Sequence, residues 1–182
     1  MKVLYTWVFG MIKNMNDIFG KLCEDAIRCL VEYMPSAEKL IKPTLLHSIR
    51  VGTYLYNNGY AENIVLAGYL HDIVEDTEIE HSYIENTFSK NILDIVLANS
   101  KDQNVEKENR NKELLQRCID FGNDALVVKI ADILDNYKYY KRINSQKGLD
   151  YCGGNTEFLI QKVPQSFKDS IFNDLKEFHE NI

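Results

Sequence analysis

The sequence predicts an all-α protein built as a helical bundle. Its 182 residues include only 3 Pro and 9 Gly, and 45% are hydrophobic, which is enough for one domain with a sizeable core. Leu and Ile recur at the three- and four-residue spacing that places side chains on one face of a helix. We expect residues 1–182 to form a single domain, with residues 1–15 as a possible loosely packed leader.

The expected helices follow one another with short breaks. The first covers about residues 16–33, and Pro35 ends it. Further helices are expected over 45–56, 61–74, 80–88, 90–98, 105–121 and 124–142. The segment "ALVVKI" could compete as a strand, but "ADILDNYKYY" continues its helical period. The loop "SQKGLDYCGGN" then leads to a last helix, or a pair of helices broken near Pro164, over 156–180.

The N-terminus and the cysteines point to a cytoplasmic protein without a membrane partner. The stretch "MKVLYTWVFGMI" is apolar but short for a membrane span, and no small-residue cleavage site follows it, which favours a packed or loosely attached leader over the alternative of a signal-like segment. The four cysteines form no CxxC pair. Cys23 and Cys29 are six positions apart, which favours small apolar core residues in a reducing compartment over a zinc site. The sequence leaves the oligomeric state open.

Charge is unevenly spread along the chain. A net charge of −6 argues against a protein that coats nucleic acid. Residues 51–89 contain seven acidic residues and no Lys or Arg, whereas residues 129–147 contain five basic residues and two Asp. An acidic segment facing a basic one suits a site that holds a cation and an anionic ligand together. Two solvated faces would give the same counts.

Four ionisable residues gather in the segment "YLHDIVEDTE". His71, Asp72, Glu75 and Asp76 are spaced so that a helix would place them in one polar cluster beside an apolar face. A buried cluster of this kind needs compensation, and a metal ion is the first candidate. The alternative is a solvated helix end.

Two more polar residues interrupt apolar helix faces. His47 lies within "TLLHSIRV" and Asp132 lies within "LVVKIADIL", where an Asp is badly placed unless it is paired or bound to a metal. Two imidazoles and two carboxylates form a mixed N/O donor set that suits manganese, iron, or zinc with water. Each residue alone is more typical of a packed histidine or a helix-packing acceptor. Their joint occurrence favours a metal site.

The order of His47, the His71-Asp72 doublet and Asp132 resembles the HD-domain superfamily of metal-dependent phosphohydrolases, whose fold is all-α. More narrowly, "HDIVEDT" and "KIADILDN", with Ser100-Lys101 between them, resemble the hydrolase domain of the RelA/SpoT family and its small stand-alone alarmone hydrolases. This narrower resemblance covers about residues 40–142.

The resemblance implies a single bound Mn²⁺ and a hydrolytic reaction. The implied metal ligands are His47, His71, Asp72 and Asp132. Glu75 and Asp76 would position and deprotonate the attacking water. The implied reaction removes the 3′-pyrophosphate of ppGpp or pppGpp, giving GDP or GTP and pyrophosphate.

The substrate-binding residues follow the family less closely. The implied contacts are Asn136, at the sugar, together with Lys39, Lys101 and Tyr139. The family's Arg-Lys pair is replaced by Glu38-Lys39, and an acid at the first position would repel a phosphate. Another nucleotide therefore stays open as substrate, through a 5′-nucleotidase-like or NADPH phosphatase activity. So does a non-catalytic nucleotide-sensing HD domain, although such a domain is expected to lose Glu75 or Asp76 first.

Overall fold

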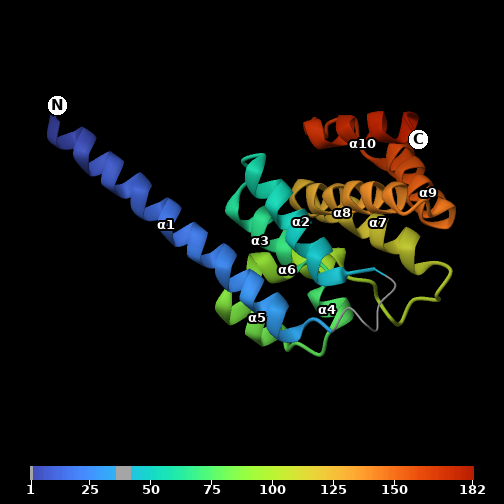
Figure 1. Cartoon of the computed structure of the whole chain (residues 1–182), viewed down its shortest axis with the longest axis horizontal. Coiled ribbons are helices and arrows are strands. Elements are labelled where there is room, and N and C mark those ends of the chain that lie inside the picture. Colours follow the sequence, from blue (N-terminus) through green and yellow to red (C-terminus); the bar gives the residue numbers. More distant parts are fainter. Residues whose placement is uncertain (1, 36–41) are drawn as a thin grey trace.

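A computed structural model of the chain shows helices joined by short connections (Figure 1). It describes the backbone of residues 2–35 and 42–182, and the side chains of 18–35 and 42–182. This described part contains no strand, so the all-α prediction is confirmed and "ALVVKI" is helical. The helices are α1 (Lys2–Tyr33), α2 (Thr44–Asn57), α3 (Glu62–Leu70), α4 (Ile73–Asp76), α5 (His81–Thr87), α6 (Lys90–Asn99), α7 (Arg110–Phe121), α8 (Asn123–Arg142), α9 (Gln146–Lys162) and α10 (Ser170–Glu180).

Helix α3 lies at the centre of the bundle. Residues 64–70 are all buried, and the helix packs against α1, α2, α6 and α8. A helix that is apolar on every side belongs in the core rather than at a surface. Helices α9 and α10 cover the far side of α8, while the N-terminal half of α1 extends away from the other helices (Figure 1).

Several predicted helix boundaries were wrong, among them the start of the helix expected over 105–121, which begins at Arg110. Helix α1 begins at Lys2, so the expected leader over residues 2–15 continues the first helix. The segment "SQKGLDYCGGN", expected to be a loop, lies almost entirely within α9. Ser145 caps this helix by accepting a hydrogen bond from the Gly148 N–H, and the two adjacent glycines adopt no positive φ. The glycines that suggested a loop are therefore helical.

The predicted helix over 61–74 is divided into α3 and α4 at His71. In an unbroken helix, the Gly68 carbonyl would accept a hydrogen bond from the backbone N–H four residues later, which is that of Asp72. Here His71 Nδ1 lies 2.9 Å from that carbonyl and takes the bond instead. The helix restarts after Asp72, whose carbonyl accepts from the N–H groups of Glu75 and Asp76.

Two glycines allow α2 and α3 to approach closely. A Cβ added at Gly52 in α2 would overlap the Tyr69 ring, and a Cβ added at Gly68 in α3 would overlap the Leu55 side chain. Tyr69 and Leu55 are buried, with 4% and 0% exposure. This contact fixes the spacing between the helix that carries His47 and the helix that ends at His71.

The cysteines are core residues, as the sequence predicted. Cys23, Cys29, Cys118 and Cys152 are buried and free. Burial raises the pKa of the first three thiols to about 11, which disfavours the thiolate.

None of the described helices combines the length and apolarity needed to cross a membrane.

We expect Gly52→Ala to destabilise the protein by about 1–3 kcal/mol, because the added methyl group must displace a buried aromatic ring. The matched control is Gly154→Ala inside α9, where an added Cβ meets no atom within 4 Å. There the gain in helix propensity should stabilise by about 0.5–1 kcal/mol. Urea unfolding of the three proteins measures both effects. Equal free energies of unfolding for the two variants would contradict the close contact.

Candidate metal centre

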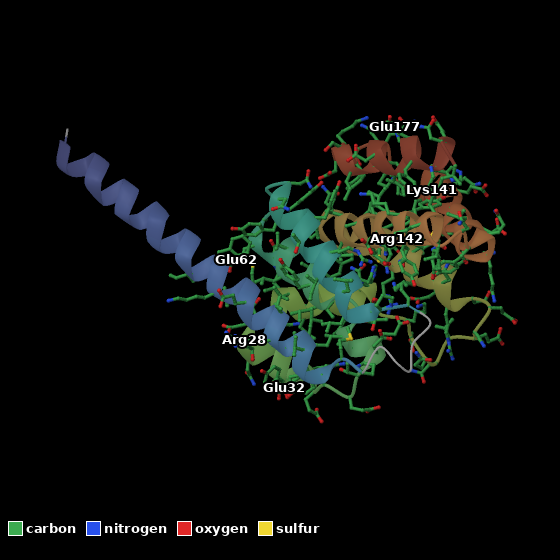
Figure 2. All side chains as sticks on the ribbon, viewed as in Figure 1. Arg28, Glu32, Glu62, Lys141, Arg142 and Glu177 are labelled. Carbon is green, nitrogen blue, oxygen red and sulfur yellow. The ribbon has the colours of Figure 1, made fainter. Side chains whose placement is uncertain are left out.

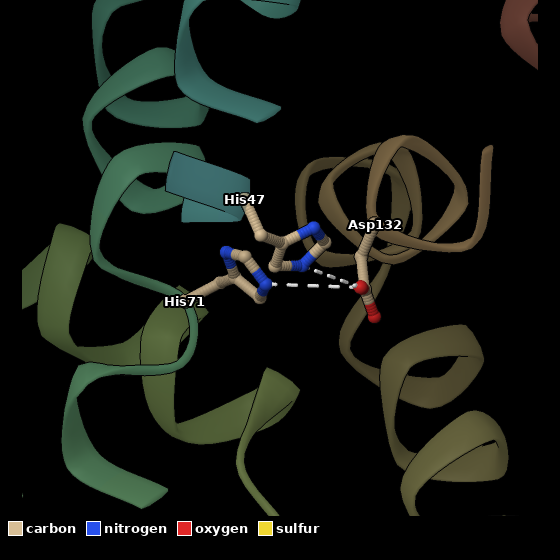
Figure 3. Close-up of side chains that lie close together, drawn as sticks. All are labelled: His47, His71 and Asp132. Atoms are coloured by element: carbon tan, nitrogen blue, oxygen red, sulfur yellow. Dashed lines mark ion pairs between the residues drawn. The ribbon is translucent and has the colours of Figure 1, made fainter. Parts of the chain in front are cut away.

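Three helices bring His47, His71 and Asp132 together in the interior (Figure 3). Asp132 Oδ1 in α8 lies 3.1 Å from His47 Nε2 and 3.8 Å from His71 Nε2. One possible ligand atom from each residue lies within 4.8 Å of the other two. That spacing suits the ligands of one ion, because metal–ligand bonds of roughly 2.0–2.2 Å place neighbouring ligand atoms about 3–4 Å apart.

Asp72 completes the predicted set of four side chains. Its Oδ1 lies 3.2 Å from His71 Nε2, and its Oδ2 lies 3.6 Å from His47 Nε2. The Asp72 side chain is 22% exposed and that of Asp132 is 13% exposed, whereas both imidazoles are fully buried. The carboxylates thus lie between the buried imidazoles and the opening to solvent.

Hydrogen bonds define which nitrogen of each imidazole faces the centre. His71 Nδ1 donates to the Gly68 carbonyl, which can only accept, so the neutral ring has a lone pair at Nε2. His47 Nδ1 donates to Asp135 Oδ2 at 2.6 Å, with the same result. Both Nε2 atoms are buried and have no hydrogen-bond partner among the described residues. A cation between them would satisfy both lone pairs, so the donor set fits a bound metal ion.

The carboxyl group of Asp132 is held in its ionised form. Burial alone would raise its pKa, but the Lys129 ammonium group at 3.0 Å outweighs burial and holds the pKa well below its usual range. Lys129 is buried in turn, and Asp132 raises its pKa against the effect of burial. Asp132 is therefore an anionic oxygen donor at neutral pH.

Asp135 and Arg50 also belong to the centre, although the sequence pattern did not single them out. Arg50 donates from Nε and from one terminal nitrogen to the two carboxylate oxygens of Asp135, each at 2.7 Å. The same carboxylate accepts from His47, and these hydrogen bonds lower the Asp135 pKa to about 2 despite partial burial. The available signal was spacing, since Arg50 lies three residues after His47 and Asp135 three residues after Asp132.

Glu75 and Asp76 lie beside the centre. Glu75 accepts hydrogen bonds from Lys101 Nζ at 2.6 Å and from the Lys101 backbone N–H at 3.1 Å, so both its oxygens are held. Partial burial and the neighbouring charges of Asp72 and Glu75 raise the pKa of Asp76 to about 6. A carboxyl group that titrates near neutrality can exchange a proton with water.

These side chains surround an open cavity of about 210 Å³. Helices α2, α4, α7, α8 and α9 all contribute to its wall. The lining residues include Lys42, Thr44, Asp72, Glu75, Asp76, Lys101, Lys129, Asp132, Asn136, Tyr140, Tyr151 and Asn155.

The structure places the four expected substrate contacts differently. Asn136 and Lys101 line the cavity, and Asn136 accepts from Lys42 Nζ at 2.7 Å and donates to Asp132 Oδ1 at 2.5 Å. Tyr139 is not brought to the cavity; its neighbour Tyr140 lines the wall instead. Lys39, like Glu38, lies outside the described residues.

The basic end of α8 does not reach the cavity. The Lys141 ammonium group lies 5.4 Å from the centre of the Phe178 ring in α10, and the Arg142 guanidinium lies 5.5 Å from that of Tyr139. Lys141 lines a shallow pocket together with Glu177 of α10, and both residues are labelled in Figure 2. These charges therefore cover apolar surface at the C-terminal end of α8.

Comparison with known proteins agrees with this geometry. A family model described as "HD domain" matches residues 29–150. The chain is 36% identical over 107 residues to a probable guanosine-3′,5′-bis(diphosphate) 3′-pyrophosphohydrolase of Mycoplasma pneumoniae, covering 52% of this chain and 15% of that protein. It is 30% identical over 98 residues to the Drosophila melanogaster guanosine-3′,5′-bis(diphosphate) 3′-pyrophosphohydrolase MESH1, covering 53% of this chain and 55% of that protein. The chain thus spans about half the length of MESH1.

Two solved structures share the fold. One is a metazoan ortholog of SpoT described as hydrolysing ppGpp, with a TM-score of 0.70 at 21% identity over 90% of this chain and 94% of that one. The other is the Listeria monocytogenes protein lmo0812, with a TM-score of 0.62 at 26% identity over 74% of this chain and 96% of that one.

Asp135→Asn should weaken binding of a divalent metal ion at this centre about 10–100-fold, because the amide no longer anchors His47 and Arg50 as a carboxylate does. The matched control is Asp120→Asn in α7, an exposed carboxyl group that accepts from Gln116. Calorimetric titration with MnCl₂ gives the dissociation constants. An unchanged Mn²⁺ affinity in Asp135→Asn would show that this carboxylate does not position the histidine.

Proposed function

The chain belongs to the HD domain family, and we propose that it is a Mn²⁺-dependent phosphohydrolase that removes the 3′-pyrophosphate of ppGpp or pppGpp. The products would be GDP or GTP and pyrophosphate. One observation carries this proposal: two buried imidazole nitrogens, which have no hydrogen-bond partner within the described part of the chain, face two carboxylates at the floor of an open cavity. The similarity to proteins named as 3′-pyrophosphohydrolases supports the choice of substrate.

In this proposal His47, His71, Asp72 and Asp132 would hold the ion. Two imidazole nitrogens with carboxylate oxygens form a mixed donor set that Mn²⁺ accepts. When bound, the ion would act as a Lewis acid on water and on a phosphate oxygen. Lys129 would keep Asp132 anionic, and Asp135 would keep the His47 lone pair directed at the centre.

Glu75 and Asp76 would handle the protons of the reaction. The two hydrogen bonds from Lys101 fix the Glu75 carboxylate at the cavity wall, where it can orient water and take its proton. Asp76 follows on the same short helix, and both carboxyl groups line the cavity.

The charge of the cavity supports an anionic substrate. Its wall carries four carboxylates, Asp72, Glu75, Asp76 and Asp132, and three ammonium groups, Lys42, Lys101 and Lys129. With neutral histidines, a divalent ion changes the net charge of this lining from −1 to +1. A positive, partly enclosed surface favours a polyphosphate over a neutral ligand.

The proposal extends to the whole protein. We propose that residues 1–182 act as one hydrolase domain, that the partner is a free nucleotide rather than nucleic acid or a membrane, and that the reaction takes place in the cytoplasm. The net charge of −6 supports the exclusion of nucleic acid.

A nucleotide panel with added MnCl₂ tests the reaction directly. We expect pyrophosphate release from ppGpp, loss of activity when EDTA removes the metal, and recovery when Mn²⁺ is restored. Separate assays for pyrophosphate and orthophosphate identify the bond that is cleaved. Orthophosphate released only from NADPH or a 5′-mononucleotide would replace the proposal with a phosphatase, and tight nucleotide binding without turnover would replace it with a sensor.

We expect Glu75→Gln and Asp76→Asn each to lower kcat by about 10²–10⁴-fold, because each removes a proton-transfer group. The dissociation constant for Mn²⁺ should change little, since neither carboxylate is among the proposed ligands. Glu85→Gln, at an exposed position of α5, is the matched control and should leave kcat unchanged. Retention of wild-type kcat in both test variants would exclude the proposed roles.

A further inference from the structure

Lys42 differs from the other two lysines of the cavity. Lys101 pairs with Glu75 at 2.6 Å and Lys129 pairs with Asp132 at 3.0 Å, so a carboxylate of the protein already neutralises each charge. Lys42 Nζ instead donates to the neutral amide oxygen of Asn136. Within residues 18–35 and 42–182, no carboxylate forms an ion pair with it. Its positive charge is therefore available to a ligand in the cavity.

Thr44 provides a second unused group on the same wall. Its Oγ1 is buried without a hydrogen-bond partner among the described residues, and the side chain lines the cavity with Lys42. Thr44 is also the first residue of α2, a helix of 14 residues whose N-terminus has no side-chain capping bond. The free N–H groups and partial positive charge of a helix start favour an anion.

We propose that Lys42 and Thr44 form a phosphate subsite for a phosphate group of the substrate other than the one held at the metal centre. An ammonium group, a hydroxyl group and a helix start on one cavity wall match the acceptor oxygens of a phosphate. This inference rests on the proposed function, because it takes the substrate to carry several phosphates.

The contacts of Asn136 define the competing explanation. Asn136 accepts from Lys42 and donates to Asp132, so Lys42 could act only by positioning a metal ligand through the amide. A positioning role would change Mn²⁺ affinity. A phosphate subsite would change phosphate affinity and leave Mn²⁺ affinity intact.

The test uses inorganic pyrophosphate as a probe, titrated calorimetrically into the full-length, Mn²⁺-loaded protein. Lys42→Met should weaken pyrophosphate binding about 10–100-fold, as expected for loss of a charge-assisted hydrogen bond. Thr44→Val should weaken it up to about tenfold. Lys42→Arg should retain most of the affinity. The matched control is Lys107→Met, at an exposed position outside the cavity. Mn²⁺ affinity and thermal unfolding are measured on every variant.

Two outcomes would overturn the subsite. One is unchanged pyrophosphate affinity in both Lys42→Met and Thr44→Val; the other is a parallel loss of Mn²⁺ affinity, which would assign Lys42 to positioning. If Lys42→Met fails to fold, Thr44→Val and Lys42→Gln carry the test with the same criteria.

The result is separable from the proposed function. Pyrophosphate binding through Lys42 without hydrolysis of ppGpp would refute the reaction alone, and hydrolysis with unaltered binding in the variants would refute the subsite alone.

Discussion

The arrangement of the site depends on two buried imidazole nitrogens, His47 Nε2 and His71 Nε2. Each carries a lone pair and has no hydrogen-bond partner among the described residues. Burying such atoms without a hydrogen bond costs free energy, so other contacts must keep the two rings in place. The Gly68 carbonyl holds one ring and the Asp135 carboxylate holds the other. Stability and site geometry are therefore set by the same contacts.

Gly68 shows how closely these two requirements are linked. Its carbonyl accepts from His71 Nδ1, and its missing Cβ leaves room for Leu55 of α2, the helix that also carries His47. The distance between the two imidazoles thus follows from how closely two helices approach at a residue without a side chain. Asp132 comes from α8, which packs against both.

The sequence was sufficient to predict the all-α fold class and to predict that His47, His71 and Asp132 gather at one centre. Polar residues that interrupt apolar helix faces need compensation, and that requirement points to His47, Asp132 and the polar cluster of residues 71–76. The resemblance to HD-domain hydrolases then implied which of these residues are metal ligands. The sequence was not sufficient for the Arg50–Asp135 pair, because that bond joins residues 85 positions apart and depends on how α2 and α8 dock. The helical state of "SQKGLDYCGGN" was missed because local glycine content suggests a loop, whereas tertiary packing of α9 against α7 and α8 overrides it.

The bond between His71 and the Gly68 carbonyl has an evolutionary consequence. That bond ends α3, and the restart after Asp72 sets the direction in which Glu75 and Asp76 leave the backbone. A descendant that lost His71 would lose a proposed metal ligand and the chain break together, and its two carboxyl groups would be redirected by a continuous helix. On the proposed roles, a change at Glu75 or Asp76 would remove a proton-transfer group and leave the chain break in place, whereas a change at His71 would remove a ligand and the break together. A lineage that drifts from turnover toward recognition would keep its histidines longest.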